Sequence, residues 1–97
     1  MNILVTGGCG FIGSNFIELI IDKDEVSKVV NVDCLSYAGS LDNTSKFSQN
    51  YKYIFENYDL SDYSQTYDTF YKHDITHVVH LAAESHVDNS IKGSKEL

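Results

Sequence analysis

The stretch Thr6–Gly13, TGGCGFIG, follows directly on the apolar run Ile3–Val5, and it decides the fold. Half of its eight residues are glycine. The apolar run is typical of a short buried strand over residues 2–6, which the glycines end. Beyond them, apolar residues recur at helical spacing and predict an amphipathic helix over residues 11–22. The side chains predicted on its buried face are Ile12, Phe16, Leu19 and Ile20.

The alternation of strand and helix continues along the chain. Apolar or alternating runs predict strands at residues 28–33, 51–56 and 76–81. The polar residues 35–50 predict a long loop with one helical turn around residues 41–47. A second helix is expected after Ser61 as its N-cap, with aromatic residues at helical spacing that we interpret as core and interface side chains. These aromatic residues are Tyr63, Tyr67, Phe70 and Tyr71.

These elements together predict a fold class. Parallel strands can be joined only by crossover connections, and such crossovers are right-handed. The pattern therefore predicts an α/β domain, a partial Rossmann fold with a parallel sheet of about four strands in the order 3-2-1-4 and flanking helices.

The glycine spacing indicates a phosphate-binding turn. Gly8, Gly10 and Gly13 match G-x-G-x-x-G, and Gly7, Gly10 and Gly13 match G-x-x-G-x-x-G. Between a strand and a helix, the first glycines permit the tight turn, Gly10 admits a pyrophosphate to the backbone, and Gly13 lets the helix pack on the strand. The amides at the start of the helix then face the phosphates, so no cationic side chain is required.

Asp33 indicates which dinucleotide the turn binds. It ends the second predicted strand, twenty residues after Gly13, where a carboxylate can accept both ribose hydroxyls of adenosine. Because Cys34 follows and the chain contains no Arg, a 2′-phosphate would be repelled, and the expected cofactor is NAD rather than NADP. The alternative is that a strand-terminal Asp merely begins a turn.

Two further stretches follow strand ends at the same predicted sheet edge. Asp59-Leu60 comes after the third strand and is interpreted either as a carboxylate near the adenine amino group or as a helix cap. Leu81-Ala82-Ala83 ends the fourth strand, and its small side chains leave room for a flat cofactor where α/β sheets bind ligands.

Composition excludes several other classes. Fourteen acidic residues against seven Lys give a formal net charge of -7, so no nucleic-acid partner is expected. No stretch approaches the roughly 20 apolar residues of a membrane span, and we expect a cytoplasmic protein without a membrane partner.

The cysteines and histidines do not predict a metal site. Cys9 and Cys34 lack the paired spacing of a zinc site and are interpreted as reduced thiols, with Cys9 a small packed side chain. His80, His86 and Asp88 straddle a strand end without a spacing that would bring them together, so no metal is expected.

Three segments together resemble one enzyme family. They are TGGCGFIGS (residues 6–14), VDCLSYAGSLDN (residues 32–43) and HLAAESHVDNSI (residues 80–91). They are similar to the amino-terminal part of the dTDP-glucose 4,6-dehydratases, which are extended short-chain dehydrogenases/reductases. The resemblance spans essentially the whole chain, with YAGSLDN and AAESHVDNS its most specific parts.

The resemblance implies roles for particular residues. Phe11 and Ile12 would contact the NAD pyrophosphate, and Asp33, Cys34, Leu35 and Ser36 would hold the adenosine ribose. Asp59 and Leu60 would lie at the adenine. Leu81, Ala82, Ala83 and Ser85 would lie along the cofactor, with Ser85 also at the nucleotide-sugar substrate.

It also implies a reaction. In that family NAD takes hydride from sugar C4, water is eliminated across C5 and C6, and hydride returns to C6. The product is a 4-keto-6-deoxy sugar nucleotide that feeds rhamnose biosynthesis, and the parent enzyme is expected to be a homodimer.

The chain contains no Tyr followed four residues later by Lys, the family's catalytic pair. We therefore expect residues 1–97 to be the amino-terminal part of an NAD-binding Rossmann domain, with no catalytic residue and no substrate domain. The fourth strand would then be an exposed apolar edge through which the chain self-associates. The open alternatives are part of another NAD-dependent nucleotide-sugar epimerase or dehydratase, a nucleotide-binding module without catalysis, and an inert gene remnant.

Overall fold

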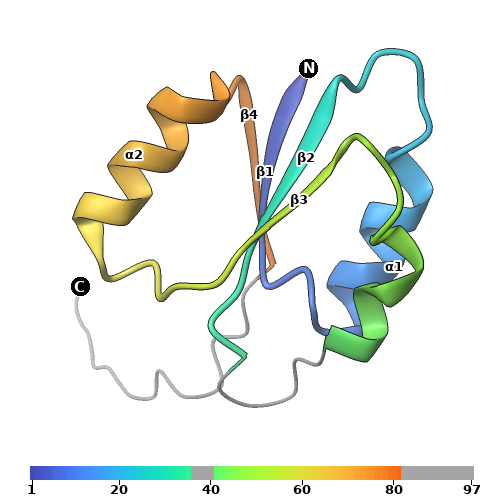
Figure 1. Ribbon diagram of the computed structural model, residues 1–97, viewed down its shortest axis with the longest axis horizontal. Helices are drawn as coiled ribbons and strands as arrows, with labels where there is room; N and C mark the ends of the chain where they lie inside the picture. The colour runs from blue at the N-terminus through green and yellow to red at the C-terminus, as the bar shows by residue number, and fades with distance from the viewer. Residues whose placement is uncertain (36–40, 82–97) are drawn as a thin grey trace.

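The computed structural model of the chain describes residues 1–35 and 41–81. Their elements run in the order β1 (Asn2–Thr6), α1 (Phe11–Ile20), β2 (Lys28–Val32), the 3-10 helix η1 (Leu41–Phe47), β3 (Tyr53–Glu56), α2 (Tyr63–His73) and β4 (His77–His80). The strands form one parallel sheet in the order β3-β2-β1-β4 (Figure 1). The predicted fold class and strand order are confirmed.

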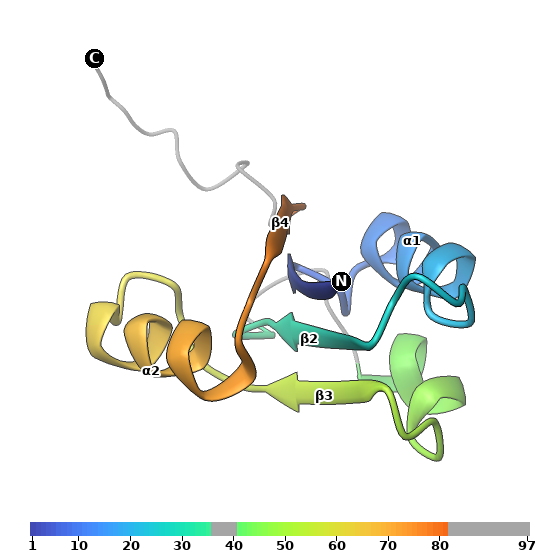
Figure 2. The ribbon, with the colours of Figure 1, turned by 90° about the horizontal axis from the view of Figure 1, so that it is seen from above.

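The sheet separates two layers of helix. Figure 2 shows α1 and η1 on one face and α2 on the other. Because successive side chains of a strand point to opposite faces, β1 contributes to two core clusters. Ile3 and Val5 pack with Ile17 of α1 and Phe47 of η1, and Leu4 packs with another set of side chains toward α2. Both faces of the central strands are thus apolar, as expected for a parallel sheet.

The predicted buried face of α1 is confirmed for Phe16 and Ile20, which are partly buried against the core, and wrong for Ile12 and Leu19. Ile12 and Leu19 are each 73% exposed, whereas Gly13, Ser14 and Ile17 are buried. The reason is steric, because a Cβ at Gly13 would lie 2.2 Å from the Gly7 carbonyl oxygen. The Gly13 side of the helix must therefore face the glycine turn, and this turns Ile12 and Leu19 toward the outside.

The prediction that the α2 aromatic residues form core is also wrong. The side chains of Tyr63, Tyr67 and Tyr71 are exposed, and Phe70 is only partly covered. The helix instead turns Thr69 and His73 toward the sheet. The Thr69 hydroxyl lies 2.7 Å from the hydroxyl of Tyr58, so α2 is attached through polar contacts.

Several element ends differ from the predicted bounds. The N-cap of α2 is Asp62 rather than Ser61, because the Asp62 carboxylate accepts the Gln65 N–H at 3.2 Å. Strands β2, β3 and β4 are each one or two residues shorter than predicted, and α1 ends at Ile20. The helical turn predicted around residues 41–47 is confirmed as η1.

Strand β4 forms one edge of the described sheet. Its partner is β1, and three of its four residues are exposed, including Val78 at 51%. Among the described residues, no helix is long and apolar enough to cross a membrane.

Candidate functional site

The glycine turn between β1 and α1 is shaped by contacts within the protein. Gly7 adopts a φ of 74°, a conformation that favours glycine. A Cβ at Gly8 would lie 2.4 Å from the Asn31 side-chain oxygen and 2.7 Å from Ile17. Together with the close approach of Gly13 to Gly7, these contacts show that the fold itself requires glycine at positions 7, 8 and 13.

Gly10 is different from the other three glycines. Its φ of -75° and ψ of 171° suit any residue, and a Cβ there would make only an ordinary 3.5 Å contact with the Gly7 carbonyl oxygen. No described contact within the protein therefore requires glycine at this position. Its effect is to leave the backbone open on the outer side of the turn.

The amino end of α1 begins at this open position. Gly10 is the N-cap, and it provides no side-chain hydrogen bond to the helix. The first N–H groups of an α-helix have no partner within the helix, and such uncapped groups attract anions. Phe11 and Ile12, predicted to contact a pyrophosphate, are the first two residues of α1.

Asp33 lies directly beyond β2 and contacts the glycine turn. One carboxylate oxygen accepts the Cys9 N–H at 2.9 Å, and the other accepts the Leu35 N–H at 2.8 Å. Each carboxylate oxygen has a further lone pair with which it can accept a ribose hydroxyl. The structure therefore brings together the two features that the sequence predicted as a dinucleotide site, the glycines and Asp33.

Cys9 is held tightly inside the turn. The side chain is fully buried, and burial raises the pKa of the Cys9 thiol, opposed by its hydrogen bond with Asn31. The η1 residue Asn43 donates a 2.7 Å hydrogen bond to the Cys9 carbonyl oxygen. The interpretation of Cys9 as a small packed thiol is confirmed, and Cys34, like Cys9, is a reduced cysteine.

Sequence reasoning missed Asn31. This residue lies within β2, has no exposed surface and accepts the Gly8 N–H at 2.9 Å through its side-chain oxygen. The available signal was an amide in the middle of the apolar strand Lys28–Val32, where a buried polar side chain needs a specific partner.

The remaining predicted site residues follow other strand ends. Asp59 is exposed and accepts the Ser61 N–H at 2.9 Å, so it begins a turn rather than capping α2, and Leu60 packs partly against the core. Leu81 follows β4 and donates its N–H to the Thr6 carbonyl oxygen at 2.9 Å. Because all the strands are parallel, these residues and Asp33 lie at the carboxyl edge of the sheet.

Some predictions concern residues outside those described. They are the predicted roles of Ser36, Ala82, Ala83, Ser85, His86 and Asp88. In the described ranges 1–35 and 41–81, no group of three or more His, Cys, Asp or Glu side chains is placed to hold a metal ion.

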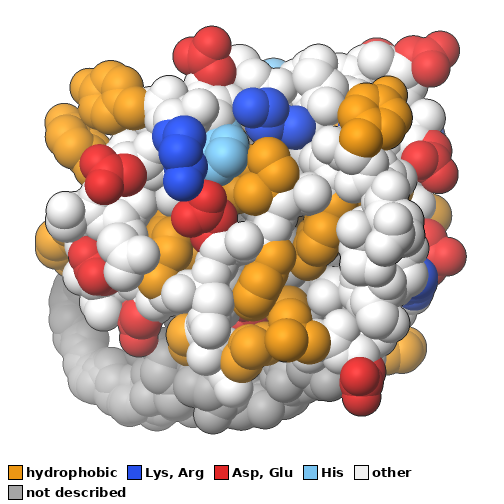
Figure 3. Space-filling view, viewed as in Figure 1, with side chains coloured by type: hydrophobic (Ala, Val, Ile, Leu, Met, Phe, Trp, Pro, Cys, Tyr) orange, Lys and Arg blue, Asp and Glu red, His pale blue; other side chains and the backbone are white. Residues whose placement is uncertain are grey.

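A charged cluster attaches α2 to β3. The Glu56 carboxylate lies 3.0 Å from the His73 ring and 3.2 Å from the Lys72 ammonium, and Figure 3 shows an acidic side chain against a His and a Lys on this face. Burial raises the pKa of Glu56, but the hydrogen bonds and charges of His73 and Lys72 outweigh it and hold the pKa below its ordinary value.

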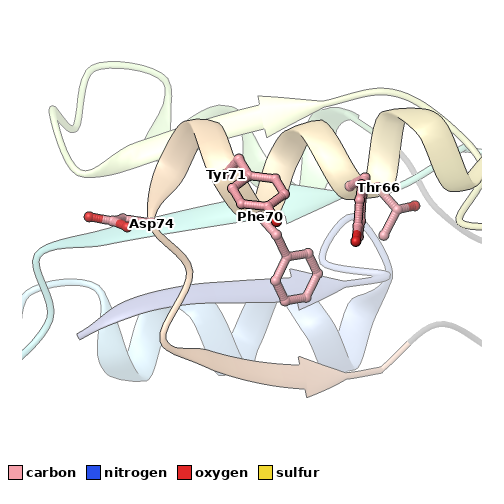
Figure 4. Close-up of a pocket in the computed structure, with 5 residues that line it drawn as sticks. Thr66, Phe70, Tyr71 and Asp74 are labelled. Carbon is pink, nitrogen blue, oxygen red and sulfur yellow. The ribbon is translucent and has the colours of Figure 1, made fainter.

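A pocket lies on the opposite side of the sheet from α1. It is lined by Thr66, Tyr67, Phe70, Tyr71 and Asp74 of α2 and its C-cap, and Figure 4 shows Phe70 pointing from α2 toward β1 and β4. Its aromatic lining and its position on the other face of the sheet separate it from the glycine turn.

Comparison with known proteins identifies the family. A sequence model of the GDP-mannose 4,6 dehydratase family matches residues 4–97. The chain belongs to this family. Among curated members, dTDP-glucose 4,6-dehydratase from Escherichia coli is 50% identical over 93 residues, which cover 96% of this chain and 26% of that protein. The corresponding enzyme from Haemophilus influenzae is 45% identical over 96 residues, covering 99% of this chain and 28% of that protein.

Solved structures agree with this assignment. dTDP-glucose 4,6-dehydratase from Bacillus anthracis in complex with NAD has a TM-score of 0.82 and 37% identity, covering 88% of this chain and 27% of that one. UDP-glucose 4-epimerase from Thermotoga maritima with UDP-glucose has a TM-score of 0.72 and 36% identity, covering 88% and 25%. The resemblance to dTDP-glucose 4,6-dehydratases is confirmed, and this family member spans about a quarter of the length of its curated relatives.

Proposed function

We propose that residues 1–97 form the amino-terminal, NAD-binding part of a dTDP-glucose 4,6-dehydratase. The observation that carries the proposal is the contact between the glycine turn and Asp33, made by the 2.9 Å hydrogen bond from the Cys9 N–H. Through this contact, the open backbone at Gly10, the uncapped end of α1 and the Asp33 carboxylate lie next to one another. A dinucleotide requires a pyrophosphate site and a ribose site in this arrangement.

Each part of the site has a role toward NAD. The amides of Phe11 and Ile12 bind the pyrophosphate, and Gly10 gives it access to the backbone. The Asp33 carboxylate accepts the adenosine ribose hydroxyls, and the family resemblance adds Cys34, Leu35 and Ser36 to the residues that hold the ribose. The chain has no Arg to neutralise a 2′-phosphate, which supports NAD over NADP.

Further contacts follow from the family resemblance. Asp59 and Leu60 lie at the adenine, and Leu81, Ala82, Ala83 and Ser85 line the cofactor, with Ser85 also contacting the nucleotide-sugar. The observation in favour is that Asp59 and Leu81 follow strands at the carboxyl edge of the sheet, where α/β domains bind ligands.

The reaction of the whole enzyme is the conversion of dTDP-glucose to dTDP-4-keto-6-deoxyglucose, a lyase reaction in the cytoplasm that feeds rhamnose biosynthesis. In this reaction bound NAD is the reversible hydride acceptor. Residues 1–97 contain no Tyr-x-x-x-Lys pair, and the contribution to this reaction that we propose for them is binding of the cofactor. A 4-epimerase is the second candidate, favoured by the 0.72 TM-score with the Thermotoga enzyme.

NAD titration of the chain by calorimetry tests the proposal. Asp33→Asn keeps the shape of the side chain but removes the charge and presents an amide N–H to a backbone N–H. We expect at least a roughly tenfold loss of NAD affinity, because hydrogen bonds to charged groups are among the stronger ones. Asp24→Asn, an exposed change in the α1–β2 loop, is the matched control and should bind like the wild type. Equal NAD binding by Asp33→Asn and wild type would contradict the proposal, as would a cooperatively folded chain that binds no NAD.

We also propose that the chain self-associates through the β4 edge, and that the whole enzyme is a homodimer. In the described sheet β4 is an edge strand whose neighbour is β1, and Val78 is half exposed. Such an edge is a template for pairing with a second chain. Sedimentation should show concentration-dependent dimers for the wild type and monomers for Val78→Lys. A monomeric wild type at high concentration would contradict self-association.

A further inference from the structure

The Asn31 side chain forms hydrogen bonds with the glycine turn from the adjacent strand β2. It lies in β2 with no exposed surface, and its side-chain oxygen accepts the Gly8 N–H at 2.9 Å. Its amide nitrogen donates to the Tyr53 hydroxyl at 3.0 Å and to the Cys9 sulfur at 3.4 Å. We propose that Asn31 is a positioning residue that holds the Gly7–Cys9 turn in the conformation that receives a pyrophosphate, an inference that rests on the proposed NAD-binding function.

The sheet alone does not explain an amide at this position. The neighbouring β2 residues Val29, Val30 and Val32 are valine, and burying an amide among them is unfavourable unless it is hydrogen-bonded. The group that gains most is the Gly8 N–H, which is buried and would otherwise need water. Without Asn31, the turn must move until that N–H reaches another acceptor.

The fit between Asn31 and the turn is mutual. A Cβ at Gly8 would lie 2.4 Å from the Asn31 side-chain oxygen. Only glycine at position 8 therefore allows this amide to approach the backbone so closely. The turn then continues through Cys9 into Gly10, whose backbone is the open part of the site. A displacement at Gly8 is therefore transmitted within two residues to the pyrophosphate site.

Neighbouring elements determine which end of the Asn31 amide faces the turn. The hydroxyl oxygen of Tyr53 and the sulfur of Cys9 lie on the nitrogen side as acceptors, which leaves the oxygen toward Gly8. Tyr53 is held against Phe47 of η1, with ring centroids 5.4 Å apart. Strand β3 and η1 thus orient Asn31, and Asn31 orients the turn.

The test compares ligands with and without a pyrophosphate. Asn31→Leu keeps about the same size and removes all three hydrogen bonds. We expect its affinity for NAD and ADP-ribose to fall roughly tenfold or more, while its affinity for adenosine, measured by ligand-observed NMR, changes less than about twofold. Thr69→Val removes a buried hydroxyl on the α2 side of the sheet and serves as the matched control. It should lower stability without changing NAD affinity.

Two measurements keep the inference testable if Asn31→Leu folds poorly or if the wild type binds no NAD. Tyr53→Phe keeps the Gly8 contact but removes one acceptor from the Asn31 amide, and it should weaken NAD binding by a smaller factor of about two to five. In the ligand-free chain, hydrogen exchange at the Gly8 amide should speed up in Asn31→Leu and remain slow in Thr69→Val.

The outcomes separate the two proposals. Lost Gly8 protection in Asn31→Leu with no NAD binding by the wild type supports the positioning of the turn and contradicts the proposed function. Unchanged NAD affinity in a folded Asn31→Leu overturns the inference, and so does an equal loss of NAD and adenosine, because that result indicates a general loss of structure.

Discussion

Replacing Gly13 and Gly10 in turn by Ala separates what the fold requires from what a ligand requires. In Gly13→Ala the new Cβ would lie 2.2 Å from the Gly7 carbonyl oxygen and 2.8 Å from the Gly8 Cα, whereas ordinary contacts begin at 3.4 Å. The turn and α1 must therefore move apart by about 1 Å, a shift of the size that forced overpacking produces. Both obstructing atoms belong to the backbone, so no side-chain rotation relieves the contact.

Two opposing effects determine how much unfolding free energy Gly13→Ala loses. Overpacking a core costs about 1–3 kcal/mol, and the rigid neighbours here favour the upper end of that range. Alanine in place of glycine within a helix stabilises the helix by about 1 kcal/mol. We therefore expect Gly13→Ala to lose about 2 kcal/mol of unfolding free energy. In a domain of this size that corresponds to a Tm lowered by roughly 8–16 °C.

Gly10→Ala is the matched variant with the opposite expectation. Its Cβ meets nothing closer than 3.5 Å, and its backbone conformation suits alanine. Stability should stay unchanged or rise by up to about 1 kcal/mol, because alanine restricts the unfolded chain. The methyl group occupies the proposed pyrophosphate position, however, and NAD affinity should fall at least roughly tenfold, as expected when a ligand phosphate loses its backbone contacts.

Thermal denaturation and NAD calorimetry on the two variants form the assay. The steric argument fails if Gly13→Ala melts within about 2 °C of the wild type, since that is less than 1 kcal/mol for a domain of this size. The assignment of Gly10 to a ligand fails if Gly10→Ala keeps wild-type NAD affinity, or if it loses stability as much as Gly13→Ala does.

Three further predictions concern the rest of the described structure. His73 and Lys72 lower the pKa of Glu56 below its ordinary value of 4.5. The stability that the Glu56 carboxylate contributes is therefore present above pH 4.5 and is lost as the pH falls below it. The Tm values of wild type and Glu56→Gln should differ at pH 7 and converge in acid. The 2.7 Å contact between Tyr58 and Thr69 predicts that Tyr58→Phe and Thr69→Val each destabilise the fold by about 1–3 kcal/mol and that the double variant loses less than their sum in urea denaturation. Because Cys9 is buried and Cys34 is partly exposed, a thiol reagent should modify Cys34 in the folded chain and Cys9 only after unfolding, and two equally fast thiols would contradict the packing of the turn.

The sheet was predictable because each step followed from a general rule. The apolar runs around Ile3–Val5 and Lys28–Val32 define strands, the helix between them requires a parallel crossover, and the doubly wound arrangement then places β4 beside β1. The glycine turn and Asp33 were predictable because their spacing is set by this same unit. The structure adds the hydrogen bond from the Cys9 N–H that joins them.

The helix faces were harder to predict, because periodicity identifies a stripe without showing what covers it. In α1 the close approach of Gly13 to Gly7, two residues six positions apart that the folded turn brings together, overrides the apolar stripe through Ile12. Asn31 was missed for a related reason. A single amide in an apolar strand signals a buried partner, but the sequence does not say that the partner is the backbone of Gly8.

The two faces of the sheet are built differently, and this has a consequence for the site. On the α1 face, apolar side chains such as Val5 and Ile17 pack without exposed surface directly behind the glycine turn. On the α2 face, the helix is attached through hydroxyls and charges, such as Thr69 and Glu56, and its three tyrosines are exposed. Polar attachments of this kind stabilise the fold less than apolar burial does, and the contacts of Glu56 weaken as the pH falls and its carboxylate is protonated. Loosening α2 should therefore leave the phosphate turn in place, because the contacts that shape the turn among the described residues come from β1, β2 with Asp33, β3, η1 and α1.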